Sequence, residues 1–378
     1  MATPLTCSLV LTTIADPALL EGYFENFAAH GHLDQVQVYV IPDTKTPRAA
    51  FDRCASLCAR GLKVHCPPLE EQDAYLQRLR LPADFIPRNS DNRRNVGYLM
   101  ALESGADFLI SIDDDNYCPE HDDFFSAHAV VCDSPATQRT VQSDTNWFNV
   151  CDLLRFEPAR CVYPRGFPYF ARHRSSSTRE LRLEAEVRIN AGLWLGDPDL
   201  DAPTWMAAPV SGRGFCGDSA VLAPDTWAPI NSQNTALHRS VVPSYYFVRM
   251  GLEHGPFPIE RFGDIFSGYF CLACAVHLGA AVRFGTPLAL HRRNSHNYLR
   301  DAAHEMTGIL LLEEILPWLQ QTKLQGATYS EAYLCLSELL EEFSGMAKGF
   351  LWTGATREYI RLTAERMRSW LGACRSIG

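Results

Sequence analysis

The sequence predicts an α/β fold with a parallel sheet that has helices on both of its faces. Two observations support this prediction. Short apolar and β-branched segments alternate with segments of helical periodicity from residue 7 to residue 112. The chain has 378 residues, of which 47% are hydrophobic, and this is enough to bury a large core.

The elements of the first third follow from local patterns. In chain order we expect a strand at 7–14, a helix at 19–27, a strand at 36–41, a helix at 48–60, a strand at 62–66, a helix at 92–104 and a strand at 106–112. Ligands in parallel α/β sheets bind at the carboxyl ends of the strands. Asp43 and the triple aspartate at 113–115 both lie at such ends.

Beyond residue 112 the chain has an irregular middle region and a C-terminal region with helical patterns. Residues 140–260 are irregular, and the polar, basic segment 171–182 predicts a mobile surface loop that closes over a ligand as a lid. Helical patterns return at 309–316, 333–343 and 359–371. We therefore predict a main domain at 1–302, with halves at about 1–118 and 119–302, and a helical C-terminal extension at 303–378.

Composition argues against several classes of partner. The net charge is −10, so a nucleic-acid polymer is a poor candidate ligand. We find no secretory signal pattern and no apolar run of about 18 residues, so we expect a cytoplasmic protein without a membrane span. A homo-oligomer is left open. The scattered cysteines predict buried thiols, and Cys271 and Cys274 form a lone CxxC pair, a weak metal signal.

The triple aspartate is the strongest chemical signal. Three adjacent carboxylates repel one another unless a cation compensates them. Alternate side chains of a strand point to the same side, so Asp113 and Asp115 can share one divalent ion, Mn²⁺ or Mg²⁺. The alternative is a solvated acidic turn.

A basic segment precedes this strand. Residues 88–97, RNSDNRRNVG, offer arginine donors and a helix start that can hold a diphosphate or a nucleotide. Gly97 lets the helix pack close to a ligand or a strand. The alternative is an exposed basic helix start.

Several segments, taken in order, resemble one family. They are VYVIPD (38–43), SDNRRNVGYLMALESGADFLISIDDDN (90–116), YPRGFP (163–168), GLWLGDPDLDAPT (192–204), QNTA (233–236), RFGDIFSG (261–268), CLACAVHLG (271–279), HRRNSHN (291–297) and EEILPWLQ (313–320). Over about residues 7–320 the chain resembles the plant reversibly glycosylated polypeptides, also known as UDP-arabinopyranose mutases, and their bacterial relatives.

The resemblance implies a GT-A (Rossmann-like) glycosyltransferase fold. The half at 1–118 would bind the nucleotide-sugar and the half at 119–302 the acceptor. Asp113 and Asp115 would be metal ligands. The residues expected to bind the donor are Thr13, Asp43, Arg88, Arg93, Asp113, Asp114, Trp194, Arg293 and His296.

The remaining candidates combine residue chemistry with the resemblance. Asp264, before an apolar helix, could act as general base, or it could cap the helix. His291, at a strand end, could complete the metal sphere, or be structural. Trp194 could stack on a sugar or base, or lie in the core, and Trp205 is a weaker acceptor-side candidate. Arg165 matches the arginine that is self-glycosylated in the plant proteins, or it is a loop cation that binds an acid.

The chain also departs from the family. The cysteine that follows the aspartates in the family is Asn116 here, and the plant proteins show two adjacent acids where this chain has Gly263 and Asp264. The helices past about residue 325 also differ. These departures put mutase activity in doubt.

The sequence therefore predicts a metal-dependent glycosyltransferase. It would move a hexose, glucose first, from a UDP-sugar to a hydroxyl of a small soluble acceptor such as a natural product or a nucleoside, with inversion if Asp264 is the base. One alternative is a mutase that interconverts pyranose and furanose forms of a UDP-sugar. Another is a self-glycosylating scaffold protein with Arg165 as its own acceptor.

Overall fold

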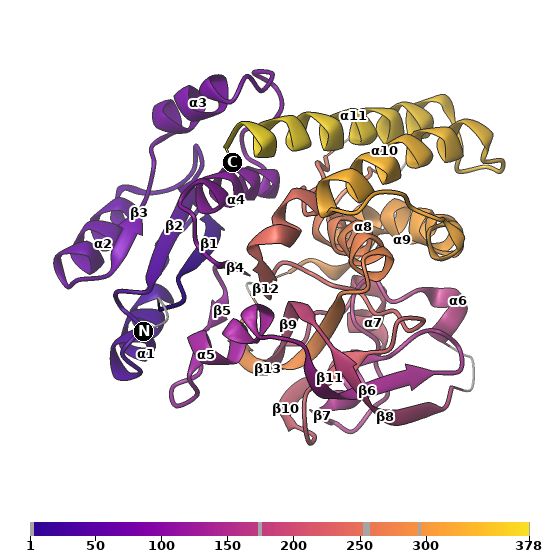
Figure 1. The fold of residues 1–378 in the computed structure, drawn as a ribbon, viewed down its shortest axis with the longest axis horizontal. Coiled ribbons are helices and arrows are strands. Elements are labelled where there is room, and N and C mark those ends of the chain that lie inside the picture. The colour runs from indigo at the N-terminus through magenta and orange to yellow at the C-terminus, as the bar shows by residue number, and fades with distance from the viewer. Residues whose placement is uncertain (1–3, 173–175, 252–257, 294–295, 378) are drawn as a thin grey trace.

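The computed structural model describes residues 4–172, 176–251, 258–293 and 296–377. Its first third confirms the predicted α/β order (Figure 1). The strands β1 (Cys7–Thr13), β2 (Val36–Pro42), β3 (Lys63–His65) and β4 (Phe108–Ile112) lie in the order β3-β2-β1-β4 and are all parallel. Strands β1, β2 and β4 are largely apolar and buried because both faces of this part of the sheet are covered, whereas β3 at the edge is more polar and more exposed.

The helices of this half are α1 (Leu20–Ala29), α2 (Arg48–Ala59), α3 (Leu69–Arg78) and α4 (Arg94–Glu103). Successive strand residues enter different cores. Leu9 and Leu11 join a core with residues of α1 and α2, whereas Val10 joins a second core with residues of α4. This alternation places helices on both faces, as predicted.

Beyond β4 the sheet is mixed, which differs from the parallel sheet that we expected. Strand β12 (Asn234–His238) runs antiparallel between β4 and β9 (Val187–Gly196), and β13 (Ala281–His291) runs parallel to β9. The edge continues through β11 (Ala220–Leu222), β6 (Ala136–Ser143) and β8 (Thr178–Ala185). Short strands pair at the side: β5 (Asn116–Tyr117) with β13, and β7 (Leu154–Glu157) with β10 (Ser211–Phe215).

The predicted lid at 171–182 needs correction. Residues 178–182 belong to β8, which pairs antiparallel with β6 along its whole length. The segment is polar because β8 is an exposed edge strand, where charged side chains are common. Residues 171 and 172 end α6 (Tyr169–Arg172), and 173–175 lie outside the described residues.

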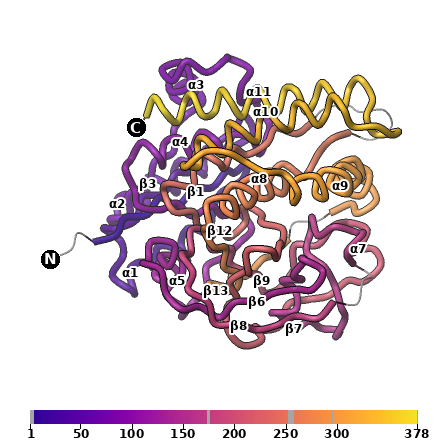
Figure 2. Tube along the Cα trace, turned by 45° about the vertical axis from the view of Figure 1, so that its right-hand side comes forward, coloured from indigo at the N-terminus to yellow at the C-terminus, as the bar shows by residue number. Residues whose placement is uncertain are grey.

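The other helices lie around the second half of the sheet, and the last three form the C-terminal part of the chain (Figure 2). They are α5 (Phe124–Ala129), α7 (Ala202–Ala207), α8 (Gly263–His277), α9 (Tyr298–Gln321), α10 (Tyr329–Met346) and α11 (Gly354–Ile377). Short 3₁₀ segments occupy Asp91–Arg93, Val130–Cys132, Val150–Leu153 and Arg239–Ser244. None of the described helices is long and apolar enough to cross a membrane.

The predicted C-terminal helices are present, and they are joined firmly to the main domain. Helix α9 begins at Tyr298, shortly before our boundary at 303. Glu305 and Glu313 on α9 accept hydrogen bonds from the backbone amides of Ala202 and Tyr169. Helix α11 lies over α4 in Figure 1 and contacts it.

Candidate active site

A cavity of about 250 Å³ lies at the carboxyl ends of β1 and β2, and we call it the strand-end cavity. It is the place where ligands of such sheets are expected. It is lined by Thr12, Thr13, Ile14, Ile41, Asp43, Lys45, Asn89, Ser90, Asp91, Arg93 and Asp114. Four of the residues predicted to bind the donor, Thr13, Asp43, Arg93 and Asp114, therefore meet here.

Asp43 is held in place by backbone donors. Its side chain accepts hydrogen bonds from the amides of Thr44, at 2.7 Å, and Ser90, at 3.1 Å. The residue is 8% exposed. The carboxylate is thus fixed at the end of β2 and retains lone pairs for a ligand.

Arg93 is almost fully buried, at 1% exposure. Its Nε donates to Oε1 of Gln72 at 3.1 Å, and the Gln72 amide donates to the carbonyl oxygens of Pro42 and Pro67. Burial lowers the pKa of Arg93. The side chain therefore supports the end of β2 as well as lining the cavity.

Arg88 lies elsewhere. It forms an ion pair with Asp73 and does not line the strand-end cavity. It lines a neighbouring cavity of about 380 Å³, which we call the side cavity. A contact of Arg88 with a nucleotide in the strand-end cavity thus stays a prediction.

A second cavity of about 280 Å³, the polar cavity, adjoins the strand-end cavity and shares Thr12, Asp91 and Asp114 with it. Its walls come from distant parts of the chain. The cavity is lined by Thr12, Asp91, Arg94, Asp113, Asp114, Asp115, Arg165, Asp199, Ser232, Gln233, Phe247, Arg261, Asp264, His291, Arg293 and His296.

The three aspartates after β4 have different partners. Asp113 Oδ1 accepts from Nη2 of Arg94 at 2.5 Å, and Arg94 Nη1 also donates to Oγ of Ser111. Asp114 Oδ2 accepts from the Thr13 hydroxyl at 2.7 Å, on the side of the strand-end cavity. The first two carboxylates are therefore tied to neighbouring groups before any ligand is bound.

Asp115 faces His291, which ends β13. Oδ2 of Asp115 lies 3.3 Å from Nε2 of His291, and Nδ1 of His291 donates to the carbonyl oxygen of Asp197 at 2.5 Å. Although burial alone would lower the pKa of His291, Asp115 raises it above its ordinary value. A carbonyl at Nδ1 leaves Nε2 directed at a ligand, which is the usual arrangement of a metal-binding histidine.

These residues fit a divalent ion in part. Within the described ranges no group of three or more His, Cys, Asp or Glu side chains is placed to hold a metal. Asp115 and His291 would supply two ligands, and Asp113 a third if it leaves Arg94. Mg²⁺ is commonly bound by one or two carboxylates together with phosphate oxygens, so this donor set suits an ion that arrives with a diphosphate.

The residue that replaces the family cysteine joins this site. Nδ2 of Asn116 donates to Oδ1 of Asp115 at 3.0 Å, and the side chain is fully buried. Its Oδ1 has no hydrogen-bond partner in the structure. The departure from the family therefore acts directly on a predicted metal ligand.

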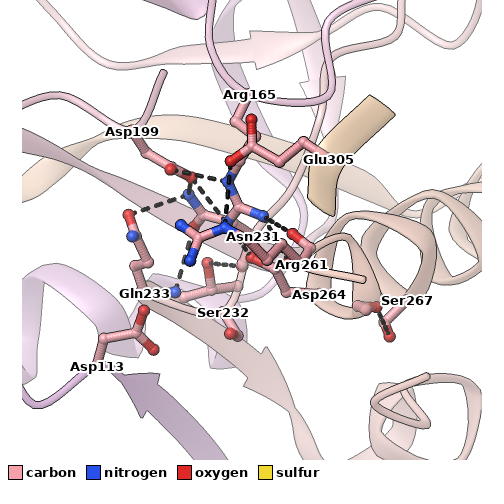
Figure 3. A network of polar contacts seen from close by, with 12 residues as sticks. Asp113, Arg165, Asp199, Asn231, Ser232, Gln233, Arg261, Asp264, Ser267 and Glu305 are labelled. Carbon is pink, nitrogen blue, oxygen red and sulfur yellow. Dashed lines mark hydrogen bonds and ion pairs between the residues drawn. The ribbon is translucent and has the colours of Figure 1, made fainter. Parts of the chain in front are cut away.

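Arg165 joins two acids in the wall of the polar cavity (Figure 3). Its Nε lies 2.9 Å from Oδ1 of Asp199, and its Nη2 lies 2.5 Å from Oδ2 of Asp264. Its Nη1 donates to Oδ1 of Asp264 at 2.9 Å and to the carbonyl oxygen of Arg261 at 2.7 Å. The side chains of Arg165, Asp199 and Asp264 are 11%, 5% and 9% exposed.

These contacts bear on two open alternatives. Asp264 lies in the first turn of α8 but is not its cap, because Phe262 occupies that position and makes no side-chain cap bond. Arg165 binds Asp199 and Asp264, in agreement with the alternative that it is a loop cation that binds an acid. Although burial alone would raise the pKa of Asp199, the charge and hydrogen bonds of Arg165 keep it below its ordinary value.

Arg293 and His296 both line the polar cavity. Nη1 of Arg293 is buried without a hydrogen-bond partner in the structure, and its guanidinium lies 5.3 Å from the ring centre of Trp205. Nδ1 of His296 pairs with Asp301 at 2.8 Å. Arg293 therefore has a free donor for a ligand, and an orphan donor of this kind is uncommon in a folded protein.

The two tryptophans lie behind the cavities. Trp194 is 3% exposed, lies on β9 within the core, and lines neither the strand-end cavity nor the polar cavity. Trp205 stacks on Tyr298 with ring centres 5.8 Å apart, and it also lines neither cavity. The structure thus favours the core alternative for Trp194.

Sequence reasoning missed Arg94, Asp91 and Asp199. Arg94 begins α4 and points toward the sheet, whereas its neighbour Arg93 points toward Gln72. The helical register of RRNVG could have distinguished the two arginines, since adjacent helix positions face different ways. Asp199 gave no local signal, because its partner Arg165 comes from a separate loop.

The family model described as "Reversibly glycosylated polypeptide" matches residues 84–378, more than half of the chain. The chain belongs to the reversibly glycosylated polypeptide family. The matched region includes α10 and α11, the C-terminal helices that we expected to differ from the family.

Individual relatives and solved structures have low sequence identity to this chain. UDP-arabinopyranose mutase 2 of Arabidopsis thaliana is 26% identical over 291 residues, which are 74% of this chain and 74% of that protein. UDP-arabinopyranose mutase 1 of Oryza sativa subsp. japonica is 28% identical over 215 residues, 56% of this chain and 53% of that protein. A crystal structure of glucosyl-3-phosphoglycerate synthase from Mycobacterium tuberculosis with Mn²⁺, UDP and phosphoglyceric acid has a TM-score of 0.43 and 13% identity, over 82% of this chain and 78% of that chain.

Proposed function

We propose that this chain is a divalent-metal-dependent enzyme that binds a UDP-sugar and breaks the bond between its anomeric carbon and its β-phosphate. One observation carries this proposal: the strand-end cavity and the polar cavity meet at Asp114, directly after β4. A nucleotide in the first cavity would place its diphosphate beside Asp113 and Asp115 and its sugar in the second cavity.

The residues divide the work by position. Asp43 would accept hydrogen bonds from the base or ribose, with Arg93 behind it and Thr13 and Asp114 toward the diphosphate. Asp113, Asp115 and His291 would hold Mn²⁺ or Mg²⁺, which when bound neutralises charge on the leaving diphosphate. Arg293 and His296 would contact the phosphates. Arg293 has the stronger support because one of its donors is unpartnered.

Two fates of the glycosyl group follow from this cleavage. Transfer of a hexose, with glucose as the first candidate, to a hydroxyl of a small soluble acceptor in the cytoplasm is the reaction that we propose. The rearrangement of a UDP-sugar between pyranose and furanose forms is the second candidate, and the names of the relatives favour it.

Residue 263 supports a departure from those relatives. A Cβ atom at Gly263 would lie 2.4 Å from the carbonyl oxygen of Val248, so the first of the two family acids has no room on this backbone. Self-glycosylation at Arg165 has less support. All three of its guanidinium nitrogens already donate to Asp199, Asp264 or a carbonyl oxygen.

A donor screen tests the proposal. The purified chain is incubated with Mn²⁺ and UDP-glucose, UDP-galactose or UDP-arabinopyranose, with and without a mixed panel of hydroxylated acceptors, and products are identified by mass spectrometry and NMR. Acceptor-dependent products indicate transfer, and isomerised donor without acceptor indicates the mutase. Intact mass detects self-glycosylation. The absence of UDP binding by calorimetry with Mn²⁺, together with no donor conversion, would refute the proposal.

A further inference from the structure

Three cavities meet at one carboxylate. Asp91 lines the strand-end cavity, the polar cavity and the side cavity. Among the residues that line these cavities within the described parts of the chain, it is the one that all three share. With a nucleotide in the strand-end cavity and its sugar in the polar cavity, a group at this position would face both of them and any second molecule in the side cavity.

Asp91 also differs from the other acids of the polar cavity in its partners. Asp113 is bonded to Arg94, Asp114 to Thr13 and Asp115 to Asn116, and Asp199 and Asp264 share Arg165. For Asp91 the structure gives local donors alone, which are the Ser90 hydroxyl at 3.4 Å and the Asn92 backbone amide. It is therefore the cavity carboxylate whose oxygens are most open to a substrate.

This openness separates Asp91 from Asp264 as a proton acceptor. Both oxygens of Asp264 receive N–H donors from Arg165. Both oxygens are therefore already occupied by the guanidinium of Arg165 and are less accessible to the hydroxyl of a substrate. Among the residues that the structure describes, no cation forms an ion pair with Asp91.

The surroundings of Asp91 favour proton exchange near neutral pH. Its side chain is exposed to the cleft, and the cavity walls around it desolvate the carboxylate in part. That desolvation, with the negative charge of Asp264, raises the pKa of Asp91 to about 6. Arg94 on α4 opposes this effect and Asp113 after β4 adds to it, while Lys45, Arg88 and Arg261 line the same cavities.

We propose that Asp91 is the catalytic base of the transfer, which accepts the proton of the attacking acceptor hydroxyl. The proposal rests on the proposed function. The acceptor oxygen forms a bond to the anomeric carbon while the bond from that carbon to the β-phosphate oxygen breaks, and its electron pair leaves with UDP. The hydroxyl proton passes to the Asp91 carboxylate and then to water. The acceptor occupies the side cavity, across Asp91 from the donor sugar.

Isosteric variants test this assignment. Asp91→Asn keeps the shape of the side chain but cannot take a proton, so kcat for transfer should fall by about 10²–10⁴-fold. UDP affinity with Mn²⁺ and the melting temperature should change little. In the wild type the rate should rise with pH through about 6, as the carboxylate ionises, and this limb should be absent in Asp91→Asn.

Two comparisons make the result decisive. Asp84→Asn changes an exposed aspartate outside these cavities and should retain the wild-type rate and pH profile. Asp264→Asn tests the competing base. If Asp91→Asn keeps the wild-type kcat and pH profile, or if Asp264→Asn alone removes the acidic limb, the assignment is overturned.

The wild-type enzyme separates this proposal from the proposed function. A wild type that converts no UDP-sugar refutes both before any variant is made. A wild type that isomerises UDP-sugars but forms no transfer product overturns Asp91 as the base for an acceptor, while UDP-sugar cleavage stands.

Discussion

The strand-end cavity and the polar cavity adjoin each other but are built differently. The first is lined by three short segments, 12–14, 41–45 and 89–93, together with Asp114. Its key carboxylate, Asp43, is fixed by backbone amides. The second gathers side chains from β1, β13, α4, α8 and several loops, including the turn after β4, and it is held by ion pairs such as those of Arg165.

This difference has energetic consequences. Backbone donors keep their positions when one side chain changes, so substitutions in the strand-end cavity should mainly affect ligand affinity. A buried ion pair that loses one partner leaves an uncompensated charge, which costs about 3–5 kcal/mol. Substitutions in the polar cavity should therefore affect both rate and stability, and four predictions test this contrast, from the largest expected effect to the smallest.

The first prediction concerns the metal. A chelator should abolish turnover and Mn²⁺ should restore it, because the carboxylates of Asp113 and Asp115 would repel the leaving diphosphate unless a cation lies between them. Asp115→Asn should lower kcat by about 10²–10³-fold, the usual cost of losing one group that stabilises transition-state charge. Both effects are measured by UDP release with and without added Mn²⁺.

Asp114→Asn is the matched control for the metal prediction. Its carboxylate accepts from Thr13 on the side of the strand-end cavity, so the change should raise the UDP dissociation constant more than it lowers kcat. Full turnover by Asp115→Asn in the presence of chelator would contradict a metal held at this site.

The second prediction concerns Arg165. Arg165→Ala should lower the free energy of unfolding by about 3–5 kcal/mol, because Asp199 and Asp264 would remain buried without their cation. Arg165→Lys keeps the charge but loses the bidentate geometry of the guanidinium, so it should lower the free energy of unfolding by less than Arg165→Ala does. Urea unfolding measures both variants, and equal midpoints for Arg165→Ala and the wild type would show that the pair does not stabilise the fold.

The pH dependence of stability follows from the same pair. Because the pKa of Asp199 is lowered in the folded state, its contribution is complete above the unfolded pKa of about 3.9 and is lost as the pH falls through the lower folded value. In Arg165→Ala the remaining burial raises that pKa above the unfolded value, so the folded state takes up the proton first, and the sign reverses: the contribution of Asp199 to stability should improve as the pH falls through the raised pKa. Unfolding curves of the variant and the wild type between about pH 3 and pH 7 measure this difference in the pH dependence of stability.

The same contrast explains what the sequence could predict. The strands at 7–14 and 36–41, the helix at 92–104 and the position of Asp43 followed from periodicity and strand ends, which are local properties. The Arg165–Asp199–Asp264 network joins residues 165, 199 and 264 through tertiary packing, and no local pattern encodes that pairing. The segment 178–182 was misjudged because an exposed edge strand and a polar loop have similar compositions.

The third prediction concerns Arg93 in the strand-end cavity. Arg93→Ala should weaken UDP binding about 10- to 100-fold, since a hydrogen bond to a charged group contributes about 1.5–3 kcal/mol. The loss comes from a missing nucleotide contact or from the freed Gln72 that Arg93 holds beside β2. Gln72→Ala separates these causes in calorimetry, and Arg48→Ala, an exposed arginine of α2, serves as control. Unchanged UDP affinity in Arg93→Ala would remove this residue from the site.

The fourth and smallest effect is expected at Gly97, where α4 packs on the parallel strands. A Cβ atom here would lie 2.4 Å from Cγ1 of Val10 and 3.0 Å from Cγ1 of Ile41, so this glycine permits the close approach of helix and sheet that the sequence indicated. Overpacking of this kind costs about 1–3 kcal/mol. The better helix propensity of alanine returns about 1 kcal/mol, so Gly97→Ala should lower the free energy of unfolding by up to about 2 kcal/mol.

Gly372 on α11 provides the opposite case for that measurement, because a Cβ atom there meets nothing within 4 Å. Gly372→Ala should therefore raise the free energy of unfolding by up to about 1 kcal/mol through helix propensity alone.

Adding Val10→Ala to Gly97→Ala removes the clashing methyl groups, and the two changes should then cost less together than the sum of each alone. Strictly additive costs would show that α4 shifts away from β1 to admit the methyl group. The sheet beneath the strand-end cavity would then be more compliant than its close packing implies.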